Sequence, residues 1–427
     1  MRKYAHDIHT PERGNVMKIM APAGDLEKLK YAVDFGADVV YLGGQQFGMR
    51  ANAGNFTMEE IREGVEYAHE RGSQVNVTVN IMARSKEMTE IVEYAKELWN
   101  IGVDGLIVAD LGVFTEIKKA IPDAFISVST QMSTTNSSTV NFLHSIGAGR
   151  VVLARELGYE EIKEICENRS EGLEVEVFAH GAMCISYSGR CLLSNYLTGR
   201  DSNRGECAQP CRWQYSLMEK TREGEYFPVE ESERGTFIFN SKDLCLVEHI
   251  PELMEIGVDS IKIEGRMKSI FYVATTTAVY KEAIKRAEAY LRGDADEYVW
   301  QDLYEELTKI SHRDYTKGFY HGKTNETSQN YGTSSYVRNY DFMAQVLEDT
   351  DEEGITKISQ RNKFTVGDEM EVLSPGKVYD EVKLTALYDE KGNERQDAPH
   401  PMETLLAKFE GAKLKKGDLI RKNVKNN

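Results

Sequence analysis

The sequence lacks long apolar runs. No stretch approaches the roughly 18 apolar residues that a membrane-spanning helix needs, and residues 1–16 are polar and of mixed charge. Such a start is unlike the apolar core of a secretory signal and unlike a transit peptide. These absences argue against a membrane partner, and we expect a cytoplasmic protein.

Several hydrolase and nucleotide-binding signatures are also missing. There is no G-x-S-x-G elbow, no phosphate-binding P-loop and no G-x-G-x-x-G run. His69-Glu70 is followed by Ser73 where an H-E-x-x-H zinc site needs histidine. The common serine-hydrolase, zinc-peptidase and nucleotide-binding classes therefore have no support in the sequence.

The sequence has fewer basic than acidic residues. The 427 residues include 52 lysines and arginines against 69 aspartates and glutamates, which gives a formal net charge of −17. An acidic protein has no general attraction for nucleic acid, so an RNA partner would require a local basic patch. The length and a hydrophobic content of 41% predict a large domain and a smaller one.

Cysteine is scarce but clustered. Four of the six cysteines, Cys184, Cys191, Cys207 and Cys211, form a C-x6-C-x15-C-x3-C pattern. Disulfides are rare in a reducing cytosol, so four neighbouring thiols favour a metal centre. An iron–sulfur cluster, zinc and plain buried cysteines all fit the spacing, and the irregular intervals favour the cluster. The three-cysteine C-x3-C-x2-C pattern of radical enzymes is absent because Gln214 takes its third position.

A unit in which glycine precedes a short apolar strand is repeated along the chain. It begins at Gly36, Gly102, Gly147 and Gly257. Eight short, largely β-branched segments read as strands separated by helical patterns. They are Lys18–Ala23, Val39–Gly43, Gln74–Asn80, Gly105–Ala109, Phe125–Ser129, Arg150–Ala154, Glu174–Ala179 and Ser260–Glu264. This alternation predicts an α/β fold, a (β/α)8 TIM-like barrel over residues 17–292, with a doubly wound open sheet as the alternative.

The last two predicted strands are unusually far apart. Residues 181–241 form an insertion after strand 7 that carries all four clustered cysteines, and a helix is expected near 242–256. Barrel enzymes place their chemistry at this face of the sheet. After a connecting region over 293–334, short alternating strands predict a small antiparallel β-barrel over 335–427. Such a module could bind RNA or protein, or serve only for packing.

Polar residues follow the ends of the predicted strands, where barrel sites are built. We assign candidate catalytic roles to His180, Glu156 and Glu264. Candidate substrate-binding residues are Arg50, Asn80, Gln131, Arg155, Arg190, Arg204 and Arg266. The cations suit an anionic small molecule or RNA phosphates, whereas loop ion pairs and capping are the alternative roles.

The chain resembles the U32 family, long labelled collagenase-like peptidases. The resemblance runs from about Met17 through the C-terminal module. It is carried by Ala21-Pro-Ala-Gly-Asp25, Tyr41-Leu-Gly-Gly44, Ser129-Thr-Gln131, Val152-Leu-Ala-Arg-Glu156, His180-Gly-Ala-Met-Cys184, Ser188-Gly-Arg-Cys191, Arg204-Gly-Glu-Cys207, Gln209-Pro-Cys211-Arg212 and Lys262-Ile-Glu-Gly-Arg-Met-Lys268.

Over its whole length the chain looks like the family's tRNA hydroxylases, which make 5-hydroxyuridine at the wobble position with prephenate and without dioxygen. The resemblance implies a [4Fe–4S] cluster, in preference to zinc, on Cys184, Cys191, Cys207 and Cys211. It implies tRNA and prephenate as partners. A U32 paralogue or a second copy of the chain is a further expected partner, since some members work in pairs. The family label also leaves two other functions open: a peptidase, and a cluster-bearing partner subunit without catalysis of its own.

Overall fold

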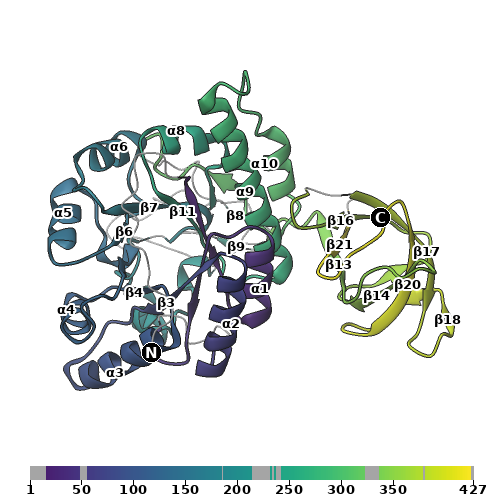
Figure 1. Cartoon of the computed structure of the whole chain (residues 1–427), viewed down its shortest axis with the longest axis horizontal. Helices are drawn as coiled ribbons and strands as arrows, with labels where there is room; N and C mark the ends of the chain where they lie inside the picture. Colours follow the sequence, from purple (N-terminus) through teal and green to yellow (C-terminus); the bar gives the residue numbers. More distant parts are fainter. Residues whose placement is uncertain are drawn as a thin grey trace.

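The computed structural model describes residues 16–48, 55–184, 186–213, 231–232, 235–236, 242–322, 336–377 and 380–424. Figure 1 shows two bodies, a large α/β barrel and a smaller β-barrel beside it. Within the described part of the chain, no helix combines the length and apolarity that crossing a membrane requires.

The large body is a closed barrel of parallel strands surrounded by helices. In the described residues its strand order is β1-β2-β3-β4-β5-β6-β7-β11, and β11 pairs with both β7 and β1 to close the ring. The strands are β1 (Lys18–Pro22), β2 (Val39–Gly43), β3 (Gln74–Val79), β4 (Gly105–Val108), β5 (Ile126–Val128), β6 (Arg150–Val152), β7 (Glu174–Ala182) and β11 (Ser260–Ile263). The closure confirms the predicted (β/α)8 TIM-like barrel and shows that the open-sheet alternative is wrong.

Helices cover the outside of the barrel because each presents an apolar stripe to it. They are α1 (Leu26–Asp34), α2 (Met58–Glu70), α3 (Met88–Ile101), α4 (Leu111–Ala120), α5 (Ser137–Ser145), α6 (Tyr159–Asn168), α8 (Ile250–Glu255), α9 (Ile270–Arg292) and α10 (Gln301–Leu307). Side chains cap the starts of α1, α2, α4, α5 and α9. In α2, for example, Thr57 accepts from the backbone N–H of Glu60 and the Glu60 carboxylate accepts from that of Thr57.

The repeated glycine unit has a structural role at the amino ends of the strands. Gly36, Gly102, Gly147 and Gly257 all have positive φ, between 82° and 107°, which glycine adopts without steric cost. In three copies an aspartate follows two residues later. Asp38, Asp104 and Asp259 accept hydrogen bonds of 2.7–2.9 Å from backbone N–H groups of β1, β3 and β7. Each aspartate therefore ties its own strand to the neighbouring strand of the barrel.

In its described residues, the insertion after β7 contains little regular structure. Its described elements are α7 (Leu193–Thr198), the 3₁₀ helices η3 (Ser202–Arg204) and η4 (Pro210–Arg212), and the short hairpin β8 (Glu231–Ser232) and β9 (Gly235–Thr236). The helix expected near 242–256 is shorter than predicted. Residues Asp243–Cys245 instead form β10, antiparallel to the end of β7, and β12 (Tyr315–Thr316) extends this edge. The buried position of β10 between two strands overrides its local helical pattern.

The C-terminal body is an antiparallel β-barrel, as predicted. In the described residues its strands pair in the order β16-β21-β13-β14-β20-β17, and β17 closes the ring on β16. They are β13 (Tyr340–Val346), β14 (Ile355–Gln360), β16 (Glu369–Leu373), β17 (Asp380–Tyr388), β20 (Thr404–Glu410) and β21 (Leu419–Asn423), with short pairings β15 (Phe364–Thr365), β18 (Glu394–Arg395) and β19 (Asp397–Ala398).

A buried ion network joins the two barrels. Arg421 on β21 is 0% exposed and contacts Glu306 of α10 at 2.7 Å and Glu371 of β16 at 2.6 Å. Lys309 bridges Glu306 and Glu371 from the other side. Figure 1 shows α10 between the larger barrel and the smaller one. The network therefore fixes the small barrel against the helical layer of the large one.

Candidate active site

A cavity of about 300 Å³ opens at the carboxyl ends of the barrel strands. Residues that follow β3, β5, β6 and β11 form its floor, and the start of the cysteine-bearing insertion forms its wall. This is the face on which (β/α)8 barrels carry their sites. The sequence prediction that the insertion lies over the site is thus compatible with the geometry.

The four clustered cysteines, Cys184, Cys191, Cys207 and Cys211, all line this one cavity. None of the four takes part in a disulfide among the described residues. The backbone N–H of Gln209 donates to Sγ of Cys207 across 3.4 Å, a contact that favours a charged sulfur. Four thiols that converge on one space match the donor set of an iron–sulfur cluster.

The remaining cysteines differ in their surroundings. Cys166 and Cys245 are buried, and neither lines the cavity. Burial raises the pKa of Cys166 to about 12 and that of Cys245 to about 11, so both remain protonated thiols at neutral pH. Their environment is that of packing residues.

The sulfur spacing also bears on the choice of metal. A zinc ion with Zn–S bonds of about 2.3 Å requires its sulfurs to lie close together. Among the described residues, the one group of three or more ligand atoms mutually within 4.8 Å is Glu248, His249 and His321, and the cysteines form no such group. No three of the four sulfurs therefore lie within 4.8 Å of one another in this structure, a wider spacing than that of the sulfurs around a bound zinc ion.

The insertion is held in place by contacts that require particular backbone shapes. Gly189, with φ of 74°, packs on the Gln131 side chain so closely that a Cβ would lie 2.9 Å from it. Gly181, with φ of 109°, lies against the backbone of Glu264, where a Cβ would approach a carbonyl oxygen to 2.4 Å. These glycines let the cysteine-bearing wall approach the strand ends directly.

Arg155 connects the cysteine wall to the barrel floor. Its guanidinium donates to the carbonyl oxygen of Ala182 at 2.7 Å and to Oγ of Ser188 at 2.8 Å. Burial opposes its charge, but the neighbouring Cys184 and Glu264 outweigh burial and raise the pKa of Arg155. Arg155 therefore places a positive charge beside Cys184 in the wall of the cavity.

The floor of the cavity carries an excess of positive charge. Arg155, Lys262, Arg266 and Lys268 line it, whereas Glu264 is the one carboxylate among the lining residues. Lys262 is paired with Glu176 at 3.0 Å beneath the floor. The remaining cations can act on a bound anion, and they form a local basic site in an otherwise acidic protein.

Neighbouring groups fix the charged side chains of the floor. Nη2 of Arg266 donates to Oδ1 of Asn55 at 2.9 Å. The phenol of Tyr41 lies 3.2 Å from Oε2 of Glu264. Lys262 lies over the Tyr41 ring, 4.4 Å from its centroid. The site is consequently pre-organised before any ligand binds.

A pair of amides forms another part of the wall. Nδ2 of Asn80 donates to Oε1 of Gln131 at 2.7 Å, and Nε2 of Gln131 donates to the carbonyl oxygen of Asn80 at 3.0 Å. The Ser129 hydroxyl also donates to Oε1 of Gln131, at 3.1 Å. Both amides line the cavity, so the structure brings together these two predicted substrate-binding residues.

His180, a predicted catalytic residue, lies elsewhere. It is 1% exposed and does not line the cavity. Its ring packs among Tyr272, Tyr280 and Tyr315. Burial, aided by nearby positive charge, lowers the pKa of His180 to about 3. A neutral ring in this position packs the end of β7 and does not reach a ligand in the cavity.

Other predicted residues also fall outside the cavity lining. Arg204 pairs with Glu87 at 2.6 Å and donates to the carbonyl oxygen of Met82, so it anchors the insertion to the segment after β3. Arg190 is exposed, and Glu156 is partly buried with its pKa raised by burial. None of these three lines the cavity. Arg50 lies outside the described residues.

Sequence reasoning missed several residues of the lining. Lys268 lies five residues after the end of β11, and this position could have indicated it. Lys262 lies within β11 and Tyr41 within β2, so the strand-end rule does not select them. Tyr187 and Tyr336, both partly exposed at the cavity, come from irregular segments and have no comparable sequence signal.

Together these features define a two-domain protein of the (β/α)8 class whose site combines thiols and cations. The chain belongs to peptidase family U32. The family model matches residues 24–330, and the model of the family's C-terminal domain matches residues 338–421.

Similar curated proteins include tRNA hydroxylation proteins and a collagenase. A tRNA hydroxylation protein P1 of Bacillus subtilis is 42% identical over 405 residues, which cover 95% of this chain and 94% of that protein. A tRNA hydroxylation protein P of Escherichia coli is 34% identical over 397 residues, which cover 84% and 86% respectively. A protein of Porphyromonas gingivalis named collagenase is 30% identical over 373 residues, covering 84% and 87%.

Proposed function

We propose that the protein is a tRNA-modifying enzyme that hydroxylates the wobble uridine to 5-hydroxyuridine. It uses prephenate as co-substrate, needs no dioxygen and depends on a [4Fe–4S] cluster. The similarity of almost the whole chain to a tRNA hydroxylation protein carries the proposal. The convergence of Cys184, Cys191, Cys207 and Cys211 on one cavity supports the cofactor.

The cysteines would hold the cluster, which supplies one-electron transfer when bound. Arg155 fits this environment because its guanidinium lies beside Cys184 and would offset the negative charge of a cluster held by thiolates. With four cysteine ligands no iron is left open, so the substrate is bound by protein groups. The lysine and arginine side chains of the cavity therefore determine where an anionic substrate binds.

Arg266 and Lys268 are suited to the carboxylates of prephenate. Both side chains line the cavity. Lys262 also lines it, but Glu176 partly offsets the charge of Lys262. A guanidinium can bind a carboxylate through two parallel hydrogen bonds. The low local dielectric of a cavity strengthens these contacts relative to water.

The flipped-out base has matching partners in the same space. A wobble base is single-stranded and can leave its stack to enter a pocket. Tyr187 and Tyr336 are partly exposed aromatic rings at the cavity that can stack on it. The Asn80 and Gln131 amides can bind the polar edge of a pyrimidine.

Nucleoside mass spectrometry of tRNA tests the activity. A strain that lacks this protein and its paralogues should lose 5-hydroxyuridine derivatives, and the wild-type gene should restore them. Replacing Cys207 with serine should abolish restoration and lower the iron content, whereas the matched Cys166→Ser variant should retain both, because Cys166 is a buried residue outside the cavity. Unchanged modification in the deletion strain contradicts the proposal.

The name of the P. gingivalis relative supports a peptidase as the second candidate. Within the described residues no histidine lines the cavity, so its serines and thiols lack a neighbouring imidazole base. Anaerobically purified protein should therefore leave collagen-like peptides intact. Cleavage that disappears in a Glu264→Gln variant would favour the peptidase instead.

A partner-subunit role makes a different prediction. In that case the purified, iron-loaded chain is inactive alone and becomes active when a U32 paralogue is added. Activity of the chain alone on tRNA, with prephenate and without dioxygen, rejects this role.

A further inference from the structure

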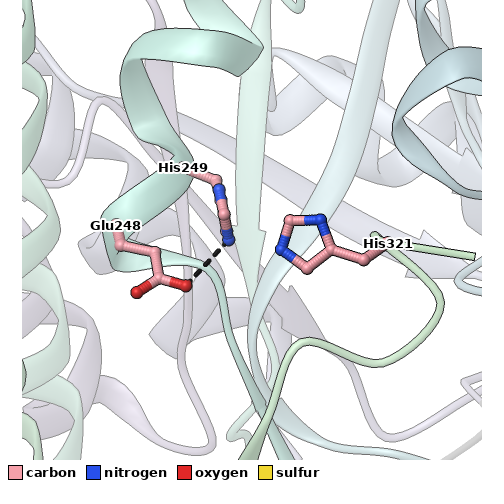
Figure 2. A group of neighbouring side chains, drawn as sticks. All are labelled: Glu248, His249 and His321. Carbon is pink, nitrogen blue, oxygen red and sulfur yellow. Dashed lines mark ion pairs between the residues drawn. The ribbon is translucent and has the colours of Figure 1, made fainter.

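A second group of ligand-type side chains lies apart from the cavity. Glu248 and His249 belong to the 3₁₀ helix η5 (Val247–His249), directly before α8, and His321 follows the β12 segment. One ligand atom from each lies within 4.8 Å of the others. Figure 2 shows the two imidazoles and the carboxylate facing one another from these two segments. None of the three lines the thiol cavity.

We propose that Glu248, His249 and His321 bind a divalent transition-metal ion, with zinc the best match. Two imidazole nitrogens and one carboxylate form the donor set of many three-ligand zinc sites, with water in the fourth position. His321 is exposed, which leaves room for that water, whereas Glu248 is partly buried. The site goes beyond the proposed hydroxylase function and does not depend on it.

The hydrogen bonding of His249 carries the proposal. The residue is 7% exposed and lies between two carboxylates. Its Nδ1 is 3.2 Å from Oε1 of Glu252 with hydrogen-bond geometry. Its Nε2 is 2.9 Å from Oε1 of Glu248 and, among the described residues, makes no hydrogen bond.

A neutral imidazole has one N–H donor and one acceptor. If Nδ1 donates to Glu252, Nε2 carries a lone pair that no hydrogen-bond donor among the described residues satisfies. Oε1 of Glu248 is a second acceptor 2.9 Å away, and the Lys317 ammonium group pairs with this oxygen in the present structure. A metal ion bound by both atoms satisfies this lone pair, and His321 supplies the third ligand.

The surroundings of His249 match those of a metal-binding histidine. Such a ligand usually donates its second nitrogen to a carboxylate, which fixes the ring. Glu252 takes this position, and its other oxygen accepts from the Tyr320 hydroxyl at 2.9 Å. The Tyr320 ring also packs on His249, with centroids 4.5 Å apart. The imidazole is therefore oriented before a metal arrives.

Lys317 is the built-in competitor. Its ammonium group forms an ion pair with the same Oε1 of Glu248. In the metal-free protein this lysine partly neutralises the carboxylate, and it must move aside when a divalent cation binds. Removing the charge of Lys317 should therefore strengthen metal binding. If Lys317 and Glu248 form only an ion pair and no metal site, the same change should leave metal binding unaffected.

Calorimetry and metal analysis of tag-free, iron-loaded, full-length protein test the site. Wild type should retain one more zinc ion per chain than His249→Gln or His321→Gln. Glu252→Gln should weaken zinc binding about 10–100-fold, the usual effect of losing the partner of a metal-bound histidine. Lys317→Met should tighten it. His69→Gln is the matched control, because His69 pairs with Asp104 on another face and should leave zinc binding unchanged.

The visible and circular dichroism spectra of each variant show whether it has folded around its cofactor. X-ray absorption spectroscopy at the zinc edge identifies the ligand atoms of the bound zinc. Nitrogen and oxygen ligands that disappear in His249→Gln support the site. Equal zinc in wild type and both histidine variants, sulfur ligands at the zinc, or no zinc bound by wild type would each overturn it.

Discussion

Replacing His180 with glutamine should change how stability depends on pH. The unfolded chain protonates this histidine below about pH 6.5, whereas burial holds its pKa at about 3 in the folded state. Between these values only the unfolded chain binds the proton, so His180 destabilises the fold as pH falls. Each pH unit costs about 1.4 kcal/mol. At pH 5 the cost is therefore about 2 kcal/mol relative to neutral pH.

Urea unfolding of both proteins between pH 7.5 and pH 5 measures this effect. At each pH the free energy of unfolding of His180→Gln is compared with that of the wild type. The packing cost of the substitution is the same at every pH, so it cancels when this difference is compared between pH 7.5 and pH 5. His180→Gln should gain about 2 kcal/mol on the wild type over this range. His69 gives a control of opposite sign: its hydrogen bond to Asp104 raises its pKa, so it stabilises the fold at acid pH and that contribution is lost as pH rises. Parallel pH curves for wild type and His180→Gln would refute the reasoning.

Three further predictions concern the contacts that hold the site and the small barrel. Arg421→Met leaves buried carboxylates with fewer counter-charges and should cost about 3–5 kcal/mol, measured as a lower thermal midpoint; Arg338→Ala, which breaks an exposed ion pair, should cost less than about 1 kcal/mol. Glu87→Gln removes the carboxylate that anchors Arg204 and should speed the loss of iron to a chelator. An unchanged rate of iron loss would show that other contacts hold the insertion in place. Gly43→Ala should displace the Arg266 guanidinium and reduce tRNA modification without unfolding, whereas Gly24→Ala, whose Cβ meets a backbone carbonyl at 2.1 Å, should lower the thermal midpoint as well.

Much of the fold could be predicted from the sequence because its local signals agree with its tertiary environment. The repeated glycine turns and β-branched strands define the parallel barrel, and β2 has the bounds predicted for it. The region of β10 is the exception. Its sequence suits a helix, but pairing with the end of β7 buries it as a strand. Pairing of this kind depends on a partner more than 60 residues away, which a local pattern does not contain.

The candidate site was predictable only in part. Strand-end position identified Asn80, Gln131, Arg155, Glu264 and Arg266, because parallel strands end at one face. Position alone does not give the direction of a side chain. His180 follows the same rule, yet β7 continues past it and turns its ring into the aromatic core. The insertion arginines were ambiguous for a similar reason, since their partners lie in distant loops.

The glycines of two family motifs have a common explanation at Arg266. A Cβ at Gly24, in the Ala21–Asp25 run, would meet the backbone carbonyl of Arg266. A Cβ at Gly43, in the Tyr41–Gly44 run, would lie 2.3 Å from its guanidinium. Segments after β1 and at the end of β2 thus leave space for a residue that follows β11. Because Gly43 leaves space for the guanidinium and Gly24 leaves space for the backbone carbonyl, the barrel itself sets the position of Arg266. A cation fixed in this way binds an anion with little loss of side-chain conformational entropy. This small entropic cost helps a protein of net negative charge to bind an anionic substrate.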